Sequence, residues 1–271
     1  MAEQAVPGTI VVVSTAADRD DFELPPPSQR VVAVFEHIAR ATGSPLAPNA
    51  DVLDFGAGAG RHVAEFRAAG YEAVGVDQQF VSHASGSAPS RYLHHVAPPE
   101  YVLPFDDDAF DFVFSTSVME HVTEPGRALA QIARVLRPGG ISIHCFPSRW
   151  RPVEPHMYMP FGGRFNSFWL CALWARLGIR NTHQRDLSAN EVTLHNAQYA
   201  KTGISYPPAR EWELRSAPLF ADVRWAETGY IEATRSVSRI SRLVAPVCAL
   251  PGVEWIYRGL HTRVLVLGRP R

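Results

Sequence analysis

Cysteine is scarce in this chain of 271 residues: Cys145, Cys171 and Cys248 are the three present, and no two of them form a Cys-x-x-Cys pair. An odd number of distant cysteines predicts neither a disulfide framework nor a thiolate zinc site. A surplus of one charge is also absent, because 26 Lys and Arg residues stand against 27 Asp and Glu residues. A net charge of −1 creates no field that attracts polyanions, so we expect no nucleic-acid partner.

Long apolar runs are missing as well. The run at 10–13 is too short for the core of a signal peptide, and the stretch at 243–250 is interrupted by Pro246 and falls short of the roughly 20 residues that a spanning helix needs. We therefore expect no export signal, no membrane span and a cytoplasmic location. A composition of 46% hydrophobic and 20% charged residues predicts a packed, enzyme-sized globular protein.

Strand and helix patterns alternate along much of the chain. Helices are predicted at 28–42, 60–69 and 124–136, and strands at 51–55, 73–77, 110–115, 141–146, 220–227 and 262–267. Alternation of this kind requires parallel pairing through right-handed crossovers. The predicted fold class is α/β, a doubly wound, mostly parallel, seven-stranded Rossmann-like sheet with helices on both faces.

Four segments follow from this pattern. Residues 1–27 are charged and Pro-rich and are predicted to be an irregular lead-in. Residues 28–147 form a Rossmann-like cofactor-binding core, 148–206 a substrate cap inserted after the fifth strand, and 207–271 complete the sheet. In the cap, Phe165, Phe168 and Trp169 fall at helical spacing, which predicts apolar core more readily than substrate contact.

A glycine-rich turn joins the first strand to its helix. The residues from Asp54 to Gly60 include Gly56, Ala57 and Gly58 and read Gly-x-Gly-x-Gly. Such a turn lies where open parallel sheets bind ligands. The third glycine of a dinucleotide fingerprint would fall at Arg61, and the pattern is therefore not that fingerprint.

Two carboxylates flank this turn. Asp54 close to a pyrophosphate would be unfavourable by about 1–4 kcal/mol per charge pair, whereas it would suit an ammonium group. Asp77 ends the second strand 21 residues after Gly56 and can accept hydrogen bonds from ribose hydroxyls. Both acids indicate a nucleoside that carries no phosphate but has an amino-acid tail.

Five segments between residues 52 and 146 resemble one known family. They are VLDFGAGAGR (52–61), GVD (75–77), LPFDDDAFDFVFS (103–115), MEHV (119–122) and LRPGG (136–140). In order and spacing they are similar to class I S-adenosylmethionine-dependent methyltransferases of the type 11 branch. The resemblance implies S-adenosylmethionine as cofactor, with its methionine end surrounded by Asp54 and the glycines of 56–60, which include Ala57.

The same resemblance assigns the remaining cofactor contacts. Asp77 would hold the ribose, Gln78 would border the adenosine, and Ser115 would approach the amino-acid end. Relatives place an Asp four residues before the Leu of the LPF segment, where this chain has Pro99. Either Glu100 after a one-residue shift or backbone groups near Tyr101 would then recognise adenine.

Acceptor chemistry is expected from the segment that leaves the fifth strand. Methyl transfer depends mainly on alignment, and a general base adds about 10²–10⁴-fold for an oxygen acceptor. His156 is the first candidate base, with Glu154 to orient it and Tyr158 to position substrate. Arg149 could bind an anionic group on the acceptor. His121 is a second candidate on the substrate side, and a structural role is the alternative for either histidine.

Metal ligands are not expected. His94, His95, His144, His183 and His195 lack the spacing of a metal motif. The predicted function is methylation of a small-molecule or glycan-like acceptor, at oxygen. The alternatives are N- or C-methylation of a small metabolite, or a non-catalytic cofactor-binding subunit of a complex. The predicted partner is the small-molecule substrate, and assembly as a homo-oligomer stays open.

Overall fold

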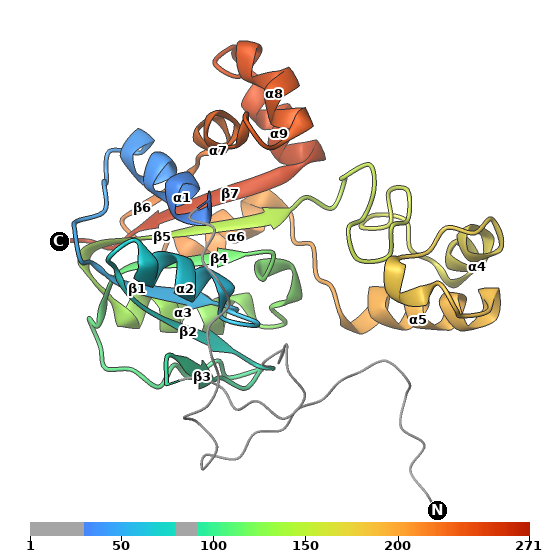
Figure 1. Ribbon diagram of the computed structural model, residues 1–271, viewed down its shortest axis with the longest axis horizontal. Helices are drawn as coiled ribbons and strands as arrows, with labels where there is room; N and C mark the ends of the chain where they lie inside the picture. The colour runs from blue at the N-terminus through green and yellow to red at the C-terminus, as the bar shows by residue number, and fades with distance from the viewer. Residues whose placement is uncertain (1–29, 80–90) are drawn as a thin grey trace, which may run out of the picture.

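The computed structural model describes residues 30–79 and 91–271. Its seven-stranded sheet has the order β3-β2-β1-β4-β5-β7-β6 (Figure 1). The strands are β1 (Asp51–Phe55), β2 (Glu72–Asp77), β3 (Leu93–His95), β4 (Phe110–Thr116), β5 (Leu136–Pro147), β6 (Asp222–Trp225) and β7 (Thr262–Gly268). All neighbouring strands pair in parallel except β7, which runs antiparallel to β5 and β6. The predicted doubly wound, mostly parallel sheet is confirmed.

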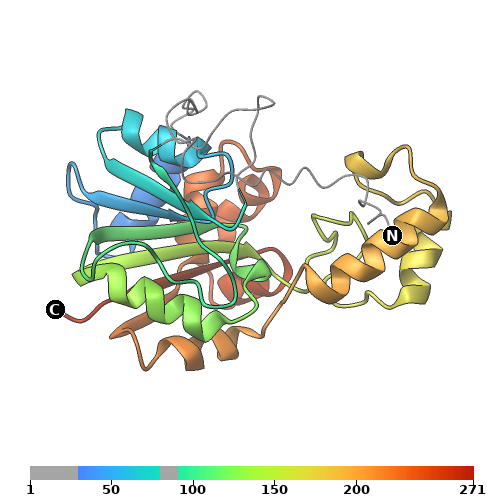
Figure 2. The ribbon, with the colours of Figure 1, turned by 90° about the horizontal axis from the view of Figure 1, so that it is seen from below.

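Helices cover both faces of the sheet (Figure 2). The α-helices of the described residues are α1 (Arg30–Ala41), α2 (Arg61–Ala68), α3 (Pro125–Val135), α4 (Phe168–Arg176), α5 (Ala189–Thr202), α6 (Ala209–Ser216), α7 (Glu227–Thr234), α8 (Arg239–Val244) and α9 (Val253–Leu260), of which α4 and α5 lie away from the sheet. Along β7, Val264 and Val266 belong to the core beneath α1 and α2, while Leu265 and Leu267 belong to the core beneath α3 and α6. Because side chains alternate along a strand, a strand covered on both faces is apolar throughout.

Three local features differ from what the sequence predicted. The strand β3 escaped prediction because its three residues, Leu-His-His, give no apolar alternation. The strand expected at 220–227 ends at Trp225, and Glu227 begins the unpredicted helix α7. The strand predicted at 141–146 begins earlier, at Leu136 directly after α3, so Gly139 and Gly140 lie inside β5, where its pairing with β4 shifts register between Phe110 and Phe112.

Residues 148–206 leave the sheet after β5 and form a separate lobe beyond the carboxyl end of that strand (Figures 1 and 2). The lobe contains α4, α5 and the short helix η2 (Thr182–Gln184). Its buried core is small and includes Met157, Met159 and Cys171. The prediction that Phe165, Phe168 and Trp169 form this core was wrong, because all three are exposed, Trp169 to 79%. Helical spacing identified one face of the helix but not whether another element covers it.

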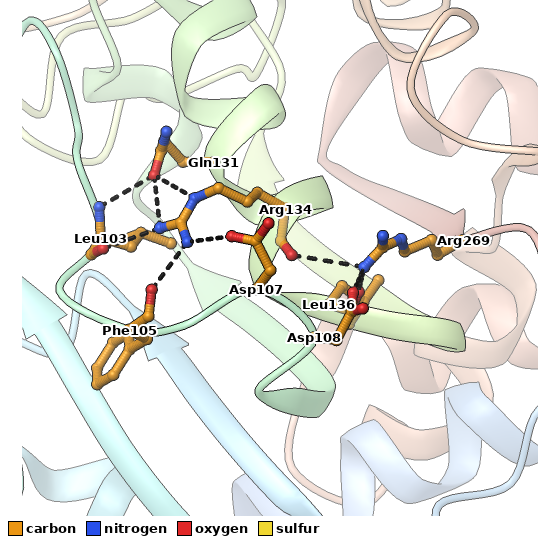
Figure 3. A network of polar contacts seen from close by, with 8 residues as sticks. All are labelled: Leu103, Phe105, Asp107, Asp108, Gln131, Arg134, Leu136 and Arg269. Carbon is orange, nitrogen blue, oxygen red and sulfur yellow. Dashed lines mark hydrogen bonds and ion pairs between the residues drawn. The ribbon is translucent and has the colours of Figure 1, made fainter.

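The segment between β3 and β4 is fixed by one arginine of α3. Arg134 donates hydrogen bonds to the carbonyl oxygens of Leu103 and Phe105 at 2.9 and 2.8 Å and to the carboxylate of Asp107 at 2.8 Å (Figure 3). Gln131 accepts from the amide of Leu103. This network holds the segment that carries Tyr101 toward the carboxyl edge of the sheet.

Among the helices of the described residues, none is both long and apolar enough to cross a membrane.

Candidate active site

The glycine turn packs tightly against the end of β4. Gly56 has a φ of +93°, and a Cβ atom at this position would overlap the side chain of Val118. The amides of Gly56 and Ala57 both donate to the carbonyl oxygen of Val76, at 2.8 and 2.9 Å. Gly60, with a φ of +73°, precedes the first residue of α2. Positive φ and close approach are both conditions that only glycine meets without strain.

Asp77 connects the second strand to the glycine turn. One carboxylate oxygen accepts a hydrogen bond from the amide of Gly58 at 2.7 Å, and the other accepts from the amide of Gln79 at 2.9 Å. Gly56, Asp77 and Gln78 line one hollow of about 220 Å³. The predicted ribose acid and the glycine turn therefore share a single hollow. Its remaining wall comes from Val96, Tyr101, Thr116, Ser117, Val118 and His121, among others.

Asp54 lies beneath the turn with 1% of its surface exposed. Neither of its carboxylate oxygens has a hydrogen-bond partner within the described part of the chain, and His62 Nδ1 lies 3.9 Å away. Burial raises the pKa of Asp54 well above its ordinary value, and the nearby charges of Asp77 and Glu65 raise it further. A cationic group brought to this carboxylate would relieve the desolvation penalty.

A second hollow of about 200 Å³ lies beside the first. Arg61, His62 and Thr116 contribute to its lining. Thr116, at the carboxyl end of β4, also lines the hollow at Asp77 and is shared by the two hollows. Burial lowers the pKa of His62, which favours a neutral imidazole there. The second hollow is also lined by apolar residues of α1, such as Val34 and Phe35, besides Arg61 and His62 of α2.

The lining of the two hollows does not include Asp54, Ala57, Gly58, Gly60, Glu100 or Ser115, and for Ser115 and Glu100 the structure shows other contacts. Ser115 is fully buried, and its hydroxyl is hydrogen-bonded to His144 Nδ1 at 2.8 Å, between β4 and β5. Burial lowers the pKa of His144 to about 3, so this imidazole is neutral. Glu100 is exposed, with a carboxylate oxygen 3.5 Å from Arg127 Nη1. Tyr101, the neighbour of Glu100, lines the hollow instead.

The loop after β5 holds an acid-imidazole pair. His156 Nδ1 lies 2.7 Å from Glu154 Oε1, and because a carboxylate only accepts, the ring nitrogen donates. Glu154 also accepts from Tyr206 Oη at 2.9 Å and from the amide of Met157 at 2.7 Å. Burial alone would raise the pKa of Glu154, but the hydrogen bonds from His156 and Met157 hold it below its ordinary value. In the neutral imidazole, this hydrogen bond leaves Nε2 as the nitrogen that carries the lone pair.

A second histidine, in the short helix that follows β4, lies beside this pair. His121 lies in the short helix η1 (Met119–His121) and donates from Nδ1 to the carbonyl oxygen of Gly203 at 2.5 Å. Its ring centroid lies 4.8 Å from that of His156, with the planes nearly perpendicular. The neighbouring Glu120 is buried, which raises the pKa of its carboxyl group to about 7. Burial lowers the pKa of His121.

Sequence reasoning missed the place of Glu120 in this group, because it lies 36 residues from His156 along the chain. Spacing rules find ligands or acid-base groups that share one helix or turn, not groups that separate elements bring together. The side chains of Glu120, His121 and His156 offer ligand atoms that lie within 4.8 Å of one another. No sequence motif indicated this grouping.

Tyr158 and Arg149 occupy different surroundings. Tyr158 is exposed and, with His156 and Tyr199, lines an open cavity of about 640 Å³ in the lobe. Arg149 lies at the start of the lobe, and its Nε is buried with no hydrogen-bond partner in residues 30–79 and 91–271. The structure places Tyr158 beside His156, but it does not place Arg149 in either of the hollows at the glycine turn or in this cavity.

Comparison with known proteins agrees with this geometry. A methyltransferase domain family matches residues 53–144. An uncharacterized methyltransferase of Mycolicibacterium paratuberculosis is 34% identical over 208 residues, which cover 70% of this chain and 78% of that relative. The chain therefore belongs to the S-adenosylmethionine-dependent methyltransferase family, as its motifs predicted.

Other similarities are more partial. An uncharacterized methyltransferase of Mycolicibacterium gilvum is 36% identical over 127 residues, which are 46% of this chain and 50% of that protein. The chain thus spans about half the length of this curated relative. Among solved structures, phosphoethanolamine N-methyltransferase 2 of Haemonchus contortus, in complex with S-adenosyl-L-methionine, aligns with 91% of this chain and 54% of its own, with a TM-score of 0.50 and 15% identity. This likeness concerns the fold.

Proposed function

We propose that this chain transfers a methyl group from S-adenosylmethionine to an oxygen atom of a small-molecule or glycan-like acceptor. When bound, the cofactor supplies a methyl group that is already activated by the sulfonium charge. The protein must then bind the acceptor, align it with the methyl group and remove a proton from it. The alternatives are transfer to nitrogen or carbon, and a cofactor-binding subunit without catalysis.

The residues at the glycine turn fit this cofactor. The orphaned carboxylate of Asp54 suits the ammonium group of a methionine end, which would satisfy a buried charge. Each carboxylate oxygen of Asp77 accepts one hydrogen bond from a backbone amide. The second lone pair of each oxygen can accept a hydrogen bond from a ribose hydroxyl. Gly56 lines the hollow at Asp77, so its backbone is part of the surface that the cofactor would approach. Gln78 and Tyr101 would border the base.

The observation that carries the acceptor proposal is the 2.7 Å hydrogen bond from His156 Nδ1 to Glu154 Oε1. It fixes the tautomer, so Nε2 can accept a proton, and Glu154 stabilises the resulting imidazolium. An oxygen acceptor requires this proton removal because a neutral hydroxyl is a poor nucleophile. His121, whose ring lies beside that of His156, borders the cofactor hollow and so connects the two halves of the site.

We assign the acceptor to the lobe of residues 148–206, in keeping with its predicted role as a substrate cap. The cavity of about 640 Å³ there is lined by His156 and Tyr158 and lies within the usual size range of small-ligand pockets. Its lining also includes Asn181, Gln184 and Tyr199, which offer amide and hydroxyl groups. Such a surface suits a hydroxylated small molecule.

Cofactor binding is tested first, by calorimetry with S-adenosylmethionine and with its demethylated product. Asp77→Asn should weaken cofactor binding by roughly 10–100-fold, because the side chain would no longer offer a charged acceptor to the two ribose hydroxyls. Glu72→Gln, at the exposed start of β2, is the matched control and should leave the affinity unchanged. Equally tight binding of NAD would contradict the cofactor assignment.

Acceptor chemistry is tested with labelled donor. The purified protein is incubated with a metabolite extract of the source organism and with panels of hydroxylated, amine and carbon-nucleophile acceptors, and products are identified by mass. A methyl ether as product would support the proposal. Methylation at nitrogen or carbon would contradict the choice of atom. Cofactor binding without any product, together with copurification of another chain, would favour the subunit alternative.

A further inference from the structure

The contact between η1 and the lobe brings three metal-ligating side chains together. Glu120 and His121 come from η1 and His156 from the lobe, and one ligand atom of each lies within 4.8 Å of the others. Two hydrogen bonds close this contact. The amide of Ser205 donates to the carbonyl oxygen of Glu120, and His121 Nδ1 donates to that of Gly203, both at 2.5 Å. The three side chains thus belong to an ordered junction.

Both imidazoles are oriented in the way that metal-binding histidines are. Each donates its Nδ1 proton, His121 to a backbone carbonyl and His156 to the carboxylate of Glu154. Such outer partners fix the tautomer and leave Nε2 as a lone-pair donor. Glu154 is held in turn by Tyr206 and the amide of Met157.

Glu120 supplies a second, independent observation. Its side chain is 1% exposed, and neither carboxylate oxygen has a hydrogen-bond partner in the part of the chain that the structure describes. Oε1 lies 3.9 Å from His121 Nε2, so the carboxylate is directed into the group. A buried carboxylate without a partner is costly, and a bound cation would compensate for its lost hydration.

We propose that Glu120, His121 and His156 bind a divalent transition-metal ion through one carboxylate oxygen and the two Nε2 atoms. Two imidazoles and one carboxylate favour zinc, manganese or iron over magnesium and calcium, which prefer oxygen ligands alone. Tetrahedral bonds of about 2.0–2.2 Å would separate the ligand atoms by about 3.3–3.6 Å. The ligand atoms would therefore have to move closer together by roughly 1 Å. Rotation of the partly exposed side chains of His121 and His156 would allow this movement.

Three protein ligands leave a coordination position open. Because His121 also lines the hollow at Asp77, a bound ion would lie close to the proposed cofactor site. The inference goes beyond the proposed function. When an ion is bound, His156 would hold it through Nε2, and the ion would lower the pKa of an acceptor hydroxyl. Without the ion, Nε2 of His156 is free to act as the proposed base.

Metal binding is measured without cofactor or acceptor. Full-length protein freed of metal with a chelator is titrated with Zn²⁺ by calorimetry, and with Mg²⁺ in parallel. We expect one Zn²⁺ site and no comparable Mg²⁺ site. Glu120→Gln and His156→Ala should each weaken Zn²⁺ binding by at least about 100-fold, and Glu154→Gln, which acts through His156, by about 10–100-fold. His37→Ala, at a partly exposed histidine of α1, is the matched control and should leave Zn²⁺ binding unchanged.

Titration with Co²⁺ adds a spectroscopic readout, since ligand-field bands should appear in the wild type and not in His156→Ala. Far-UV circular dichroism and cofactor affinity verify that each variant is folded. If Glu120→Gln fails to fold, His156→Ala, whose side chain is partly exposed, decides the outcome. Absence of a Zn²⁺ site, or Zn²⁺ affinity that is equal in all variants, would overturn the inference. Methyl transfer by chelator-treated protein would leave the proposed function intact in that case.

Discussion

The carboxyl edge of the sheet and the lobe contribute to the candidate site in different ways. At the sheet edge, Asp54, Gly56 and Asp77 lie within 24 residues of one another and are held by backbone hydrogen bonds of β1 and β2. In the lobe, His156 depends on Glu154 beside it but also on Tyr206, which lies 52 residues from Glu154. The cofactor half is therefore encoded locally, whereas the acceptor half depends on long-range contacts.

Packing differs in the same direction. The sheet is buried between two layers of helices, with Val264 to Leu267 at most 1% exposed. The lobe has a small core around Met157 and Cys171, while Trp169 stands in solvent. A part of the chain with less buried apolar surface tolerates more variation in sequence and opens more easily. Because the proposed acceptor cavity lies in the lobe and the proposed cofactor hollow at the sheet edge, we expect changes in the lobe to alter turnover and changes at the sheet edge to alter cofactor binding.

His156→Ala should separate the two halves most clearly. Removal of the imidazole should lower turnover by about 10²–10⁴-fold, since it removes the group that activates the acceptor. Cofactor affinity should stay unchanged, because His156 does not line the hollow at Asp77. Steady-state kinetics and calorimetry on the same preparation check both statements, with His37→Ala, a partly exposed histidine of α1, as control. Unchanged turnover would remove His156 from the mechanism.

Gly56→Ala should destabilise the glycine turn at the carboxyl edge of the sheet. The added methyl group would overlap Val118, and the backbone has a φ of +93°, so the free energy of unfolding should fall by about 1–3 kcal/mol and cofactor binding with it. Gly58→Ala is the matched control, since a Cβ atom there meets nothing within 4 Å, although its φ of +53° still disfavours alanine. Urea unfolding of both variants measures the difference. Equal losses would show that strain at positive φ, and not contact with Val118, dominates.

Asp54→Asn should change how stability and cofactor affinity depend on pH. Burial, with the charges of Asp77 and Glu65, raises the pKa of Asp54 above its ordinary 3.8. A raised folded-state pKa means that the stabilisation is present below 3.8 and is lost as pH rises through the folded value. The wild type should therefore lose more stability than Asp54→Asn between pH 4 and pH 8.

Cofactor affinity should move in the opposite direction. In the wild type it should rise with pH as Asp54 ionises, and at pH 8 the Asn variant should bind roughly tenfold more weakly, because a charged hydrogen bond is lost. Urea unfolding and calorimetry across the pH range measure the two effects. A parallel pH dependence in both proteins would show that Asp54 stays protonated when cofactor binds.

Trp169→Ser should have the smallest effect. The side chain is exposed on α4, so the free energy of unfolding should change by less than about 0.5 kcal/mol. Cofactor affinity and turnover should also be unaffected, since Trp169 lies outside the cavity that contains His156. Thermal unfolding and kinetics test this. A large loss of stability would indicate that another surface covers Trp169 in solution.

The sequence by itself determined the sheet, the glycine turn and the meeting of Asp77 with that turn. Alternating strands and helices allow few topologies, and the residues of the turn are neighbours in the chain, so short-range rules are sufficient. Family membership followed from the same segments. The short strand β3 and the helix α7 were not predictable, because neither has enough periodicity to be distinguished from a loop.

Only the tertiary structure decided which groups meet at the junction of sheet and lobe. Ser115 occupies the end of β4 as predicted, yet its hydroxyl bonds His144, because the register of β4 on β5 pairs these two residues. Glu120, His121 and His156 come together because the chain returns from the lobe and binds η1 through Gly203 and Ser205. Side chains so far apart in the chain are neighbours only after long-range packing fixes both elements, and no local pattern contains that information.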